Sequence, residues 1–164
     1  VQTCALPISV DYSISEKATK YHGISQEDAV NKGLALIDVL RDFMRDVRDV
    51  CSRGGRLVSH HLEFDAGILA KEMRRAGRDD VDEWSRLVRS HGFCTMCPQL
   101  GRWLSQCFGQ DTGSDTTMIT KKLEVLVHWL VPPEKRISIT SHKAGDDAQM
   151  HVEVYLAVLA LAGL

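Results

Sequence analysis

Two stretches of the sequence place acidic residues where chemistry could occur. Asp65 follows a short apolar run, residues 57–59, at the start of a predicted helix. In α/β proteins that position lies at the carboxyl edge of a sheet, where ligands bind. Asp147 lies in the first turn of the last predicted helix, five residues after His142. A loop histidine at this spacing can face the same cleft as the acid, and its pKa of about 6.5 suits it to take a proton from water.

Each of these residues also has a structural interpretation. Asp65 could be a helix N-cap, and Asp146 or Asp147 could cap the last helix, with His142 exposed in its loop. Phe64 would ordinarily belong to the core. Residue types alone therefore leave both interpretations open.

Two further segments carry candidate binding residues. Residues 18–24 present apolar and aromatic faces that could stack a nucleobase, although burial against the fold is the commoner use of such faces. A zinc site is the second candidate, because a Cys-x-x-Cys pair lies near a histidine. Its ligands would be His91, Cys94 and Cys97, with Cys107 as a fourth. Against this site stand the single Cys-x-x-Cys pair and its place on a predicted buried strand.

The predicted secondary structure alternates strands with helices, which favours an α/β domain with parallel pairing. Helix periodicity and capping residues predict helices over residues 25–50, 65–76, 81–89, 98–108, 123–130 and from 146 onward. Short apolar runs predict strands over residues 56–59 and 93–96. Two strands are too few for an independent sheet.

Apolar spacing also predicts which face of each helix is buried. The positions expected to face the core are Val30, Leu34, Ile37, Leu40, Met44 and Val47 in the first long helix, Ile68, Leu69 and Met73 in the next, and Ala148, Val152, Tyr155, Leu156 and Leu159 in the last.

Bulk composition is that of an ordinary globular domain, with 44% hydrophobic and 26% charged residues among 164. The net charge of −2 means that any nucleic-acid binding must come from a local site. No apolar run approaches the roughly 18 residues that span a bilayer, so we expect no membrane partner. The five cysteines are an odd number, which favours a reduced, intracellular setting over a disulfide framework.

The first eight residues are interpreted as an artefact. Val-Gln-Thr-Cys-Ala-Leu-Pro-Ile is the translation, residue for residue, of a common short-read sequencing adapter. We therefore expect residues 1–8 to be adapter-derived and residues 9–164 to be the native domain, with coding sequence missing upstream.

The order of the motifs resembles the DEDDh 3′→5′ exonucleases, a ribonuclease H-like superfamily that includes proofreading subunits and oligoribonucleases. The family pattern I-x-x-x-A-x-x-x-H-G-I-[ST] is matched from Ile14 to Ser25. A second pattern, hydrophobic-H-N-x-x-F-D, is matched from Val58 to Asp65, and a third, H-x-A-x-x-D-A, from His142 to Ala148. The resemblance extends from Ile14 to Ala160.

The chain departs from the family pattern in two places. His61 stands where the family has an asparagine that helps to hold the 3′-terminal nucleotide. The first family motif, D-x-E on the opening strand, does not occur before Ile14. The resemblance thus implies an incomplete ribonuclease H-like exonuclease fold, the C-terminal part of the domain, with strands 1–3 largely missing and strands 4–5 and the helices retained. Such a fragment is expected to be inactive.

The resemblance implies hydrolysis of phosphodiester bonds at the 3′ end of single-stranded DNA or RNA with two Mg²⁺ (or Mn²⁺) ions. By residue-for-residue transfer, Asp65 and Asp147 are the metal ligands and His142 is the general base. The surface for the terminal nucleotide would comprise Ala18, Tyr21, His22, His61 and Phe64. A polymerase or repair protein is a partner that the family suggests. The alternative is a catalytically dead module on the same fold that binds nucleic acid or protein.

Overall fold

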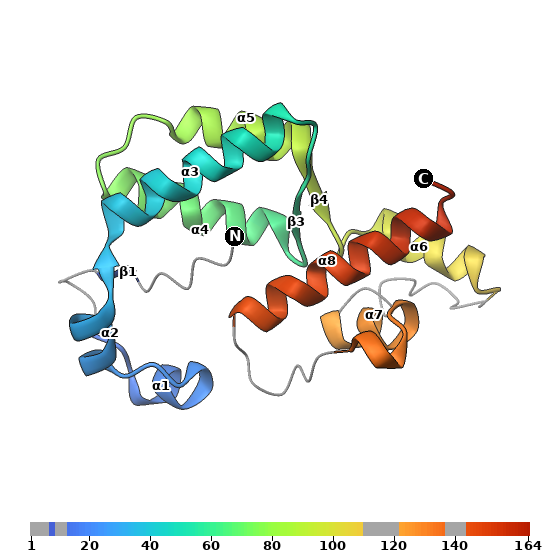
Figure 1. The fold of residues 1–164 in the computed structure, drawn as a ribbon, viewed down its shortest axis with the longest axis horizontal. Coiled ribbons are helices and arrows are strands. Elements are labelled where there is room, and N and C mark those ends of the chain that lie inside the picture. The colour runs from blue at the N-terminus through green and yellow to red at the C-terminus, as the bar shows by residue number, and fades with distance from the viewer. Residues whose placement is uncertain (1–6, 9–12, 110–121, 137–143) are drawn as a thin grey trace.

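The structure is a computed structural model, and it describes residues 7–8, 13–109, 122–136 and 144–164 (Figure 1). The described chain is a mostly helical α/β structure with a small parallel sheet, which confirms the predicted fold class. Helices α3 to α5 gather on one side of strands β3 and β4, and helices α6 to α8 lie on the other side.

The sheet next to the candidate residues has two strands, β3 (Leu57–Ser59) and β4 (Gly92–Cys94). They pair in parallel, with Val58 opposite Phe93, and the chain between them forms helices α4 (Leu62–Arg75) and α5 (Val81–His91). Gly92 is required where β4 begins, because a Cβ there would collide with the carbonyl oxygen of Val88 and with the side chain of Leu62. The predicted parallel pairing of these two segments is confirmed.

The N-terminal region differs from the prediction of one helix over residues 25–50. Ser25 is the N-cap of α2 (Gln26–Lys32), as expected, and its hydroxyl accepts a hydrogen bond from the amide of Asp28 at 3.0 Å. The helix then ends at Gly33, whose backbone is extended, and a new helix α3 (Leu36–Ser52) follows. The prediction of one continuous helix is therefore wrong. Val30, Leu34 and Ile37, which were expected to be buried, are exposed.

Two short elements complete this region. Helix α1 (Glu16–His22) precedes α2, and Figure 1 shows both projecting from one end of the molecule, away from β3 and β4. Strand β1 (Pro7–Ile8) pairs in parallel with β2 (Leu34–Ala35), a pairing that was not predicted from the sequence. The adapter origin of residues 1–8 stays a prediction.

The first hydrophobic core is formed by α3, α4 and α5. Phe43 packs edge-on against Trp84, with ring centroids 5.5 Å apart, and the indole of Trp84 donates a hydrogen bond to the carbonyl of Ala66. The buried residues, which we call the α3–α5 core, are Leu40, Met44, Val47, Cys51, Ala70, Met73, Val81 and Trp84. Four of these positions, Leu40, Met44, Val47 and Met73, were predicted to face the core, whereas Ile68 is exposed.

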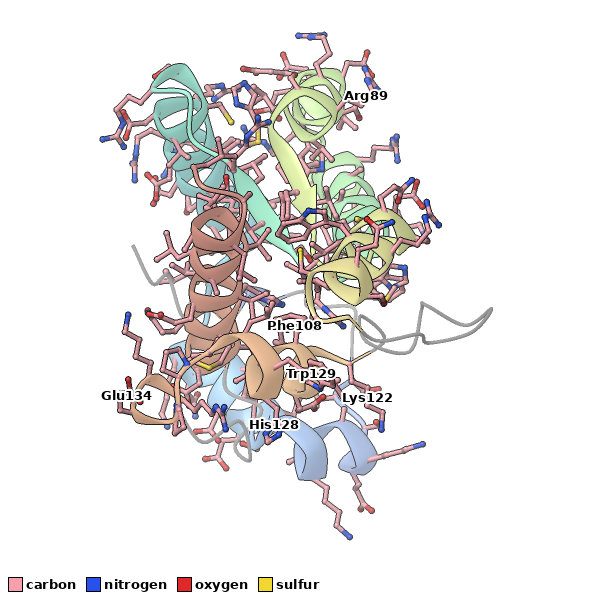
Figure 2. All side chains as sticks on the ribbon, turned by 90° about the vertical axis from the view of Figure 1, so that its right-hand side faces the viewer. Arg89, Phe108, Lys122, His128, Trp129 and Glu134 are labelled. Atoms are coloured by element: carbon pink, nitrogen blue, oxygen red, sulfur yellow. The ribbon has the colours of Figure 1, made fainter. Side chains whose placement is uncertain are left out.

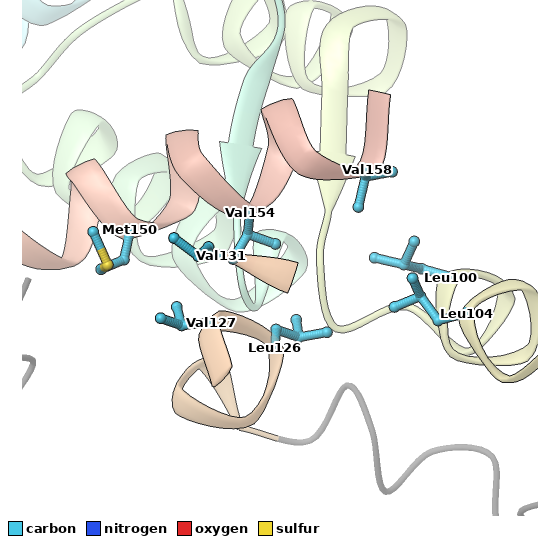
Figure 3. Packing of buried hydrophobic residues seen from close by; sticks show 8 residues of the cluster. All are labelled: Leu100, Leu104, Leu126, Val127, Val131, Met150, Val154 and Val158. Carbon is cyan, nitrogen blue, oxygen red and sulfur yellow. The ribbon is translucent and has the colours of Figure 1, made fainter. Parts of the chain in front are cut away.

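The second core is formed by the C-terminal helices (Figure 3). Helix α6 (Pro98–Cys107) begins at the predicted proline, α7 (Leu123–Leu130) has the predicted bounds, and η2 (Pro133–Lys135) precedes α8 (Ala144–Leu161). The buried residues, which we call the α6–α8 core, are Leu100, Leu104, Leu126, Val127, Val131, Met150, Val154 and Val158. Part of the predicted loop at 109–117 lies outside the described residues.

Helix α8 buries a different face from the predicted one. Met150, Val154 and Val158 point into the core, whereas Val152 and Leu156 are exposed. Leu156 instead lines a groove of about 600 Å³. Phe108 and Trp129 also line this groove, and their rings pack edge-on against each other (Figure 2). None of the described helices has both the length and the apolar composition that a membrane crossing needs.

Candidate active site

Ser59 fixes the position of Asp65 at the carboxyl end of β3. The hydroxyl of Ser59 donates a hydrogen bond to a carboxylate oxygen of Asp65 and accepts one from the amide of His61 at 3.2 Å. His61, not Asp65, is the N-cap residue of α4, and the amide of Asp65 donates to the carbonyl of His61 at 3.1 Å. The capping interpretation of Asp65 is therefore wrong, and its carboxylate is exposed at the strand end.

Asp147 reaches the same region from α8. This helix begins at Ala144, so Asp147 lies within its first turn and is half-buried. His151 follows one turn later on the same helix. Burial lowers the pKa of His151, the charge of His60 lowers it further, and the carboxylates of Asp147 and Asp65 oppose that shift. Helix α8, which carries Asp147, thus packs against β3, and its His151 stacks on His60 in the turn that leads to Asp65.

His60 and His151 were not singled out as site residues. Their rings stack with centroids 6.4 Å apart and planes inclined by 23°. Nδ1 of His60 lies 3.0 Å from the hydroxyl oxygen of Thr95, a fully buried residue whose amide donates to the carbonyl of Ser59 at 2.9 Å. One signal in the sequence could have found His151: it follows Asp147 by four residues, so both lie on one helical face.

His61 and Phe64 form an exposed aromatic pair immediately before Asp65. Their ring centroids are 5.4 Å apart and their planes are inclined by 17°. Phe64 is 58% exposed, so the interpretation of this residue as core is wrong. An exposed aromatic surface next to a carboxylate has the chemistry to stack a nucleobase.

The remaining predicted residues lie elsewhere or outside the described residues. His142 is one of those outside. Ala18 is half-buried in α1, and Tyr21 and His22 are the last two residues of that helix. Their predicted contact with the substrate stays a prediction.

Two of the predicted zinc ligands, His91 and Cys94, have other hydrogen-bond partners. Nδ1 of His91 lies 3.0 Å from the carbonyl oxygen of Gly55, and the thiol of Cys94 donates to the carbonyl of His60 at 3.5 Å. Within the described ranges, no three His, Cys, Asp or Glu side chains are grouped closely enough to hold a metal ion. Asp65 and Asp147 have the oxygen donors that a hard divalent cation prefers, but a complete site needs further ligands.

A cavity of about 590 Å³ runs along β3 and reaches Ser59 and Asp65. The carbonyl of Ser59 accepts a hydrogen bond from Thr95, so the backbone groups of Ser59 face β4. The N–H and C=O groups of successive residues in a strand point to opposite sides of the strand. Those of Val58 therefore point away from β4, into the cavity that Val58 lines. This edge of β3 can therefore accept another strand.

Comparison with protein-family models gives one match. Residues 2–155 match the model RNase_T, described as an exonuclease. No curated protein and no solved structure matches the chain.

Proposed function

The chain belongs to the RNase_T exonuclease family, and from this membership we propose that it is a 3′→5′ exonuclease acting on single-stranded DNA or RNA. The observation that carries the proposal is the packing of α8, which carries Asp147, against the end of β3, which leads to Asp65. These are the acids of the second and third family motifs. The four free cysteines among the described residues support an intracellular setting for this enzyme.

Asp65 and Asp147 are proposed to bind two divalent cations, Mg²⁺ or Mn²⁺. Carboxylate oxygens are the ligands these ions prefer. When bound, such a pair supplies an activated water and neutralises charge on the scissile phosphate. Ser59 holds the carboxylate of Asp65 in place through its hydroxyl hydrogen bond, which limits the freedom that ion binding would otherwise have to remove.

His142 is proposed as the general base that accepts the proton of the attacking water. The stacked pair of His61 and Phe64 offers an aromatic surface for the 3′-terminal nucleotide, directly beside Asp65. Ala18, Tyr21 and His22 are proposed to line the rest of this nucleotide site.

The test is the substitution Asp147→Asn in the complete gene product. It removes a charge while keeping the side-chain shape, so kcat should fall at least about 100-fold, because metal catalysis contributes several kcal/mol and each 1.36 kcal/mol is tenfold in rate. Binding of a 3′-labelled single strand, measured by fluorescence anisotropy, should change by less than about threefold. Equal losses of binding and cleavage would instead indicate a structural role for Asp147.

We also propose that a strand carrying further carboxylates pairs with β3 at the Val58 edge and completes the ion site. The open cavity beside Val58 and the need for ligands beyond Asp65 and Asp147 support this proposal. Residues 9–164 alone should then be inactive, and a longer form that carries such a strand should trim a single strand in the presence of Mg²⁺. Activity of the short form would contradict the proposed metal site. A longer form that binds nucleic acid without cleaving it would instead support a catalytically dead binding module.

A further inference from the structure

Cys94 and Cys97 lie at the two ends of one tight turn, where the chain passes from β4 to α6 (Figure 1). Cys94 is the last residue of β4, and Cys97 is the N-cap residue of α6. The amide of Cys97 donates a hydrogen bond to the carbonyl of Cys94 at 3.4 Å, which closes the turn. Such a turn holds its first and last Cα atoms within about 7 Å of each other. Disulfides join cysteines whose Cα atoms are about 4.4–6.8 Å apart, so the backbone keeps this pair within reach of a bond.

Both thiols are free, and both residues are half-buried. Cys97 packs against the edge of the α6–α8 core, and its side chain makes no capping hydrogen bond to α6. The other described cysteines are placed differently: Cys51 is buried in the α3–α5 core, and Cys107 is exposed at the end of α6. No other two cysteines of the sequence are close enough along the chain to share a turn. Only this pair therefore combines local proximity with partial exposure among the described cysteines.

The turn between the two cysteines is in contact with the turn that follows β3. The thiol of Cys94 donates a hydrogen bond to the carbonyl of His60 at 3.5 Å. A thiol is a weak donor, so rotating the sulfur away from His60 costs little. Thr95 makes the stronger contacts: its amide donates to the carbonyl of Ser59 at 2.9 Å, and its hydroxyl oxygen lies 3.0 Å from Nδ1 of His60. A change in the chemical state of Cys94 therefore acts directly on the surroundings of His60.

We propose that Cys94 and Cys97 are a redox-active pair that exchanges with a low-molecular-weight disulfide such as oxidised glutathione. The thiolate of one cysteine attacks a sulfur of the small disulfide, which forms a mixed disulfide and releases one small thiolate. The thiolate of the other cysteine then attacks the protein sulfur of the mixed disulfide, which forms the bond between Cys94 and Cys97 and releases the second small thiolate. The two protons of the protein thiols end on the two small thiols, and the two electrons that the protein gives up reduce the small disulfide.

This exchange is reversible and needs neither a metal ion nor nuclease activity. A disulfide stabilises a fold mainly by constraining the unfolded chain, and the gain grows with the length of the loop that it closes. The turn from Cys94 to Cys97 is among the shortest loops a disulfide can close, so little folding energy opposes its reduction by a small thiol. Oxidation removes the thiol hydrogen of Cys94, and with it the hydrogen bond to His60.

Trypsin makes the pair directly measurable, because both cysteines fall in one tryptic peptide, residues 90–102, and every other cysteine falls in a separate peptide. The complete gene product is equilibrated with glutathione mixtures of increasing oxidised share and quenched with acid. It is then alkylated with N-ethylmaleimide in denaturant, digested and measured by mass spectrometry. In reduced glutathione the peptide should carry two maleimide groups. In oxidised glutathione more than about half of it should carry none and be lighter by two hydrogen atoms, and dithiothreitol should restore both groups.

Cys107, Cys51 and the substitution Cys97→Ser supply matched controls. Cys107 is exposed without a neighbouring cysteine, so its peptide should gain at most a glutathione adduct. Cys97→Ser should leave Cys94 with a maleimide group or a glutathione adduct, because no second thiol can displace the glutathione. Burial raises the pKa of Cys51, so this thiol should stay free and gain a maleimide group. Its protection shows that the protein remains folded during the exchange.

Two mass-spectrometric results would overturn the proposal. One is a peptide 90–102 that keeps two maleimide groups or gains only glutathione adducts throughout the series. The other is a disulfide that forms only where Cys51 also reacts, because the bond would then belong to the unfolded chain. NMR spectra test the contact with His60: its imidazole resonances should shift on oxidation of the wild type but not of Cys97→Ser, and those of His128 on α7 should stay in place. A formed disulfide with unchanged His60 resonances would contradict the effect on the turn after β3.

Discussion

The two hydrophobic cores of the molecule are closed in different ways. The α3–α5 core is covered on its outer side by charged residues: Arg48 on α3 bonds to Glu83 at 2.8 Å and to Asp80 at 2.9 Å, and Arg78 bonds to Asp80 at 2.8 Å. The α6–α8 core has instead an apolar outer surface on α8, where Val152 is 46% and Leu156 is 52% exposed. The candidate site lies between them, with Asp65 on α4 and Asp147 on α8.

This difference explains where side-chain burial could be predicted from sequence. Helix α3 carries charged residues on one face and apolar residues on the other, so periodicity identifies its buried side. Helix α8 is apolar on most of its circumference after Glu153, so periodicity does not distinguish one face from another. A helix that is hydrophobic all round is usually covered on more than one side. The two surfaces should therefore respond differently to substitution.

The largest expected effect comes from matched methionines, one in each core. Met73 and Met150 are both fully buried. Met73→Ala and Met150→Ala should each lower the free energy of unfolding by about 2–5 kcal/mol, because each leaves a cavity in a packed core. Urea denaturation of the complete gene product measures both. A cost below about 1 kcal/mol for Met150→Ala alone would contradict this expectation. It would show that the α6–α8 core is loosely packed and that the two cores differ in packing as well as in how they are covered.

A smaller effect is expected from the ion-pair network over the α3–α5 core. Asp80→Asn leaves the half-buried Arg78 without its charged partner and removes one of the two carboxylates that bind the exposed Arg48. It should lower the free energy of unfolding by about 1–3 kcal/mol at pH 7. The exposed pair of Asp49 and Arg53 supplies the control, because Asp49→Asn should cost less than about 1 kcal/mol. Equal costs for the two substitutions would contradict a special role for the network.

The same network predicts a pH dependence with a definite sign. The hydrogen bond from Arg78 holds the pKa of Asp80 below its ordinary value of 3.8, and Arg48 likewise lowers the pKa of Glu83. A carboxyl group with a lowered pKa in the folded state stabilises the fold above its unfolded pKa and loses that contribution as pH falls. The difference between wild type and Asp80→Asn should therefore be full at pH 7 and shrink below about pH 4 in urea titrations.

The elements around the site were largely predictable, because their signals are local. Strand 57–59, the proline that opens α6 and the bounds of α7 follow from short apolar runs and helix-breaking residues. The break at Gly33 was missed because apolar spacing continues across it, from Val30 to Ile37, although these side chains are exposed. The stack of His60 on His151 was also beyond prediction, since it depends on how α8 packs against the end of β3.

The smallest expected effect concerns the exposed apolar stripe of α8. Leu156→Gln should lower the free energy of unfolding by less than about 1 kcal/mol, because half of this side chain is already in contact with solvent. Val154→Gln, two residues earlier and fully buried, should cost more than about 2 kcal/mol, because it places an amide in the core. Urea denaturation of the complete gene product compares the two directly. If Leu156→Gln costs as much as Val154→Gln, then another part of that product covers the stripe. In that case the face of α8 predicted to be buried from its sequence is buried after all, and the contrast between the two cores disappears.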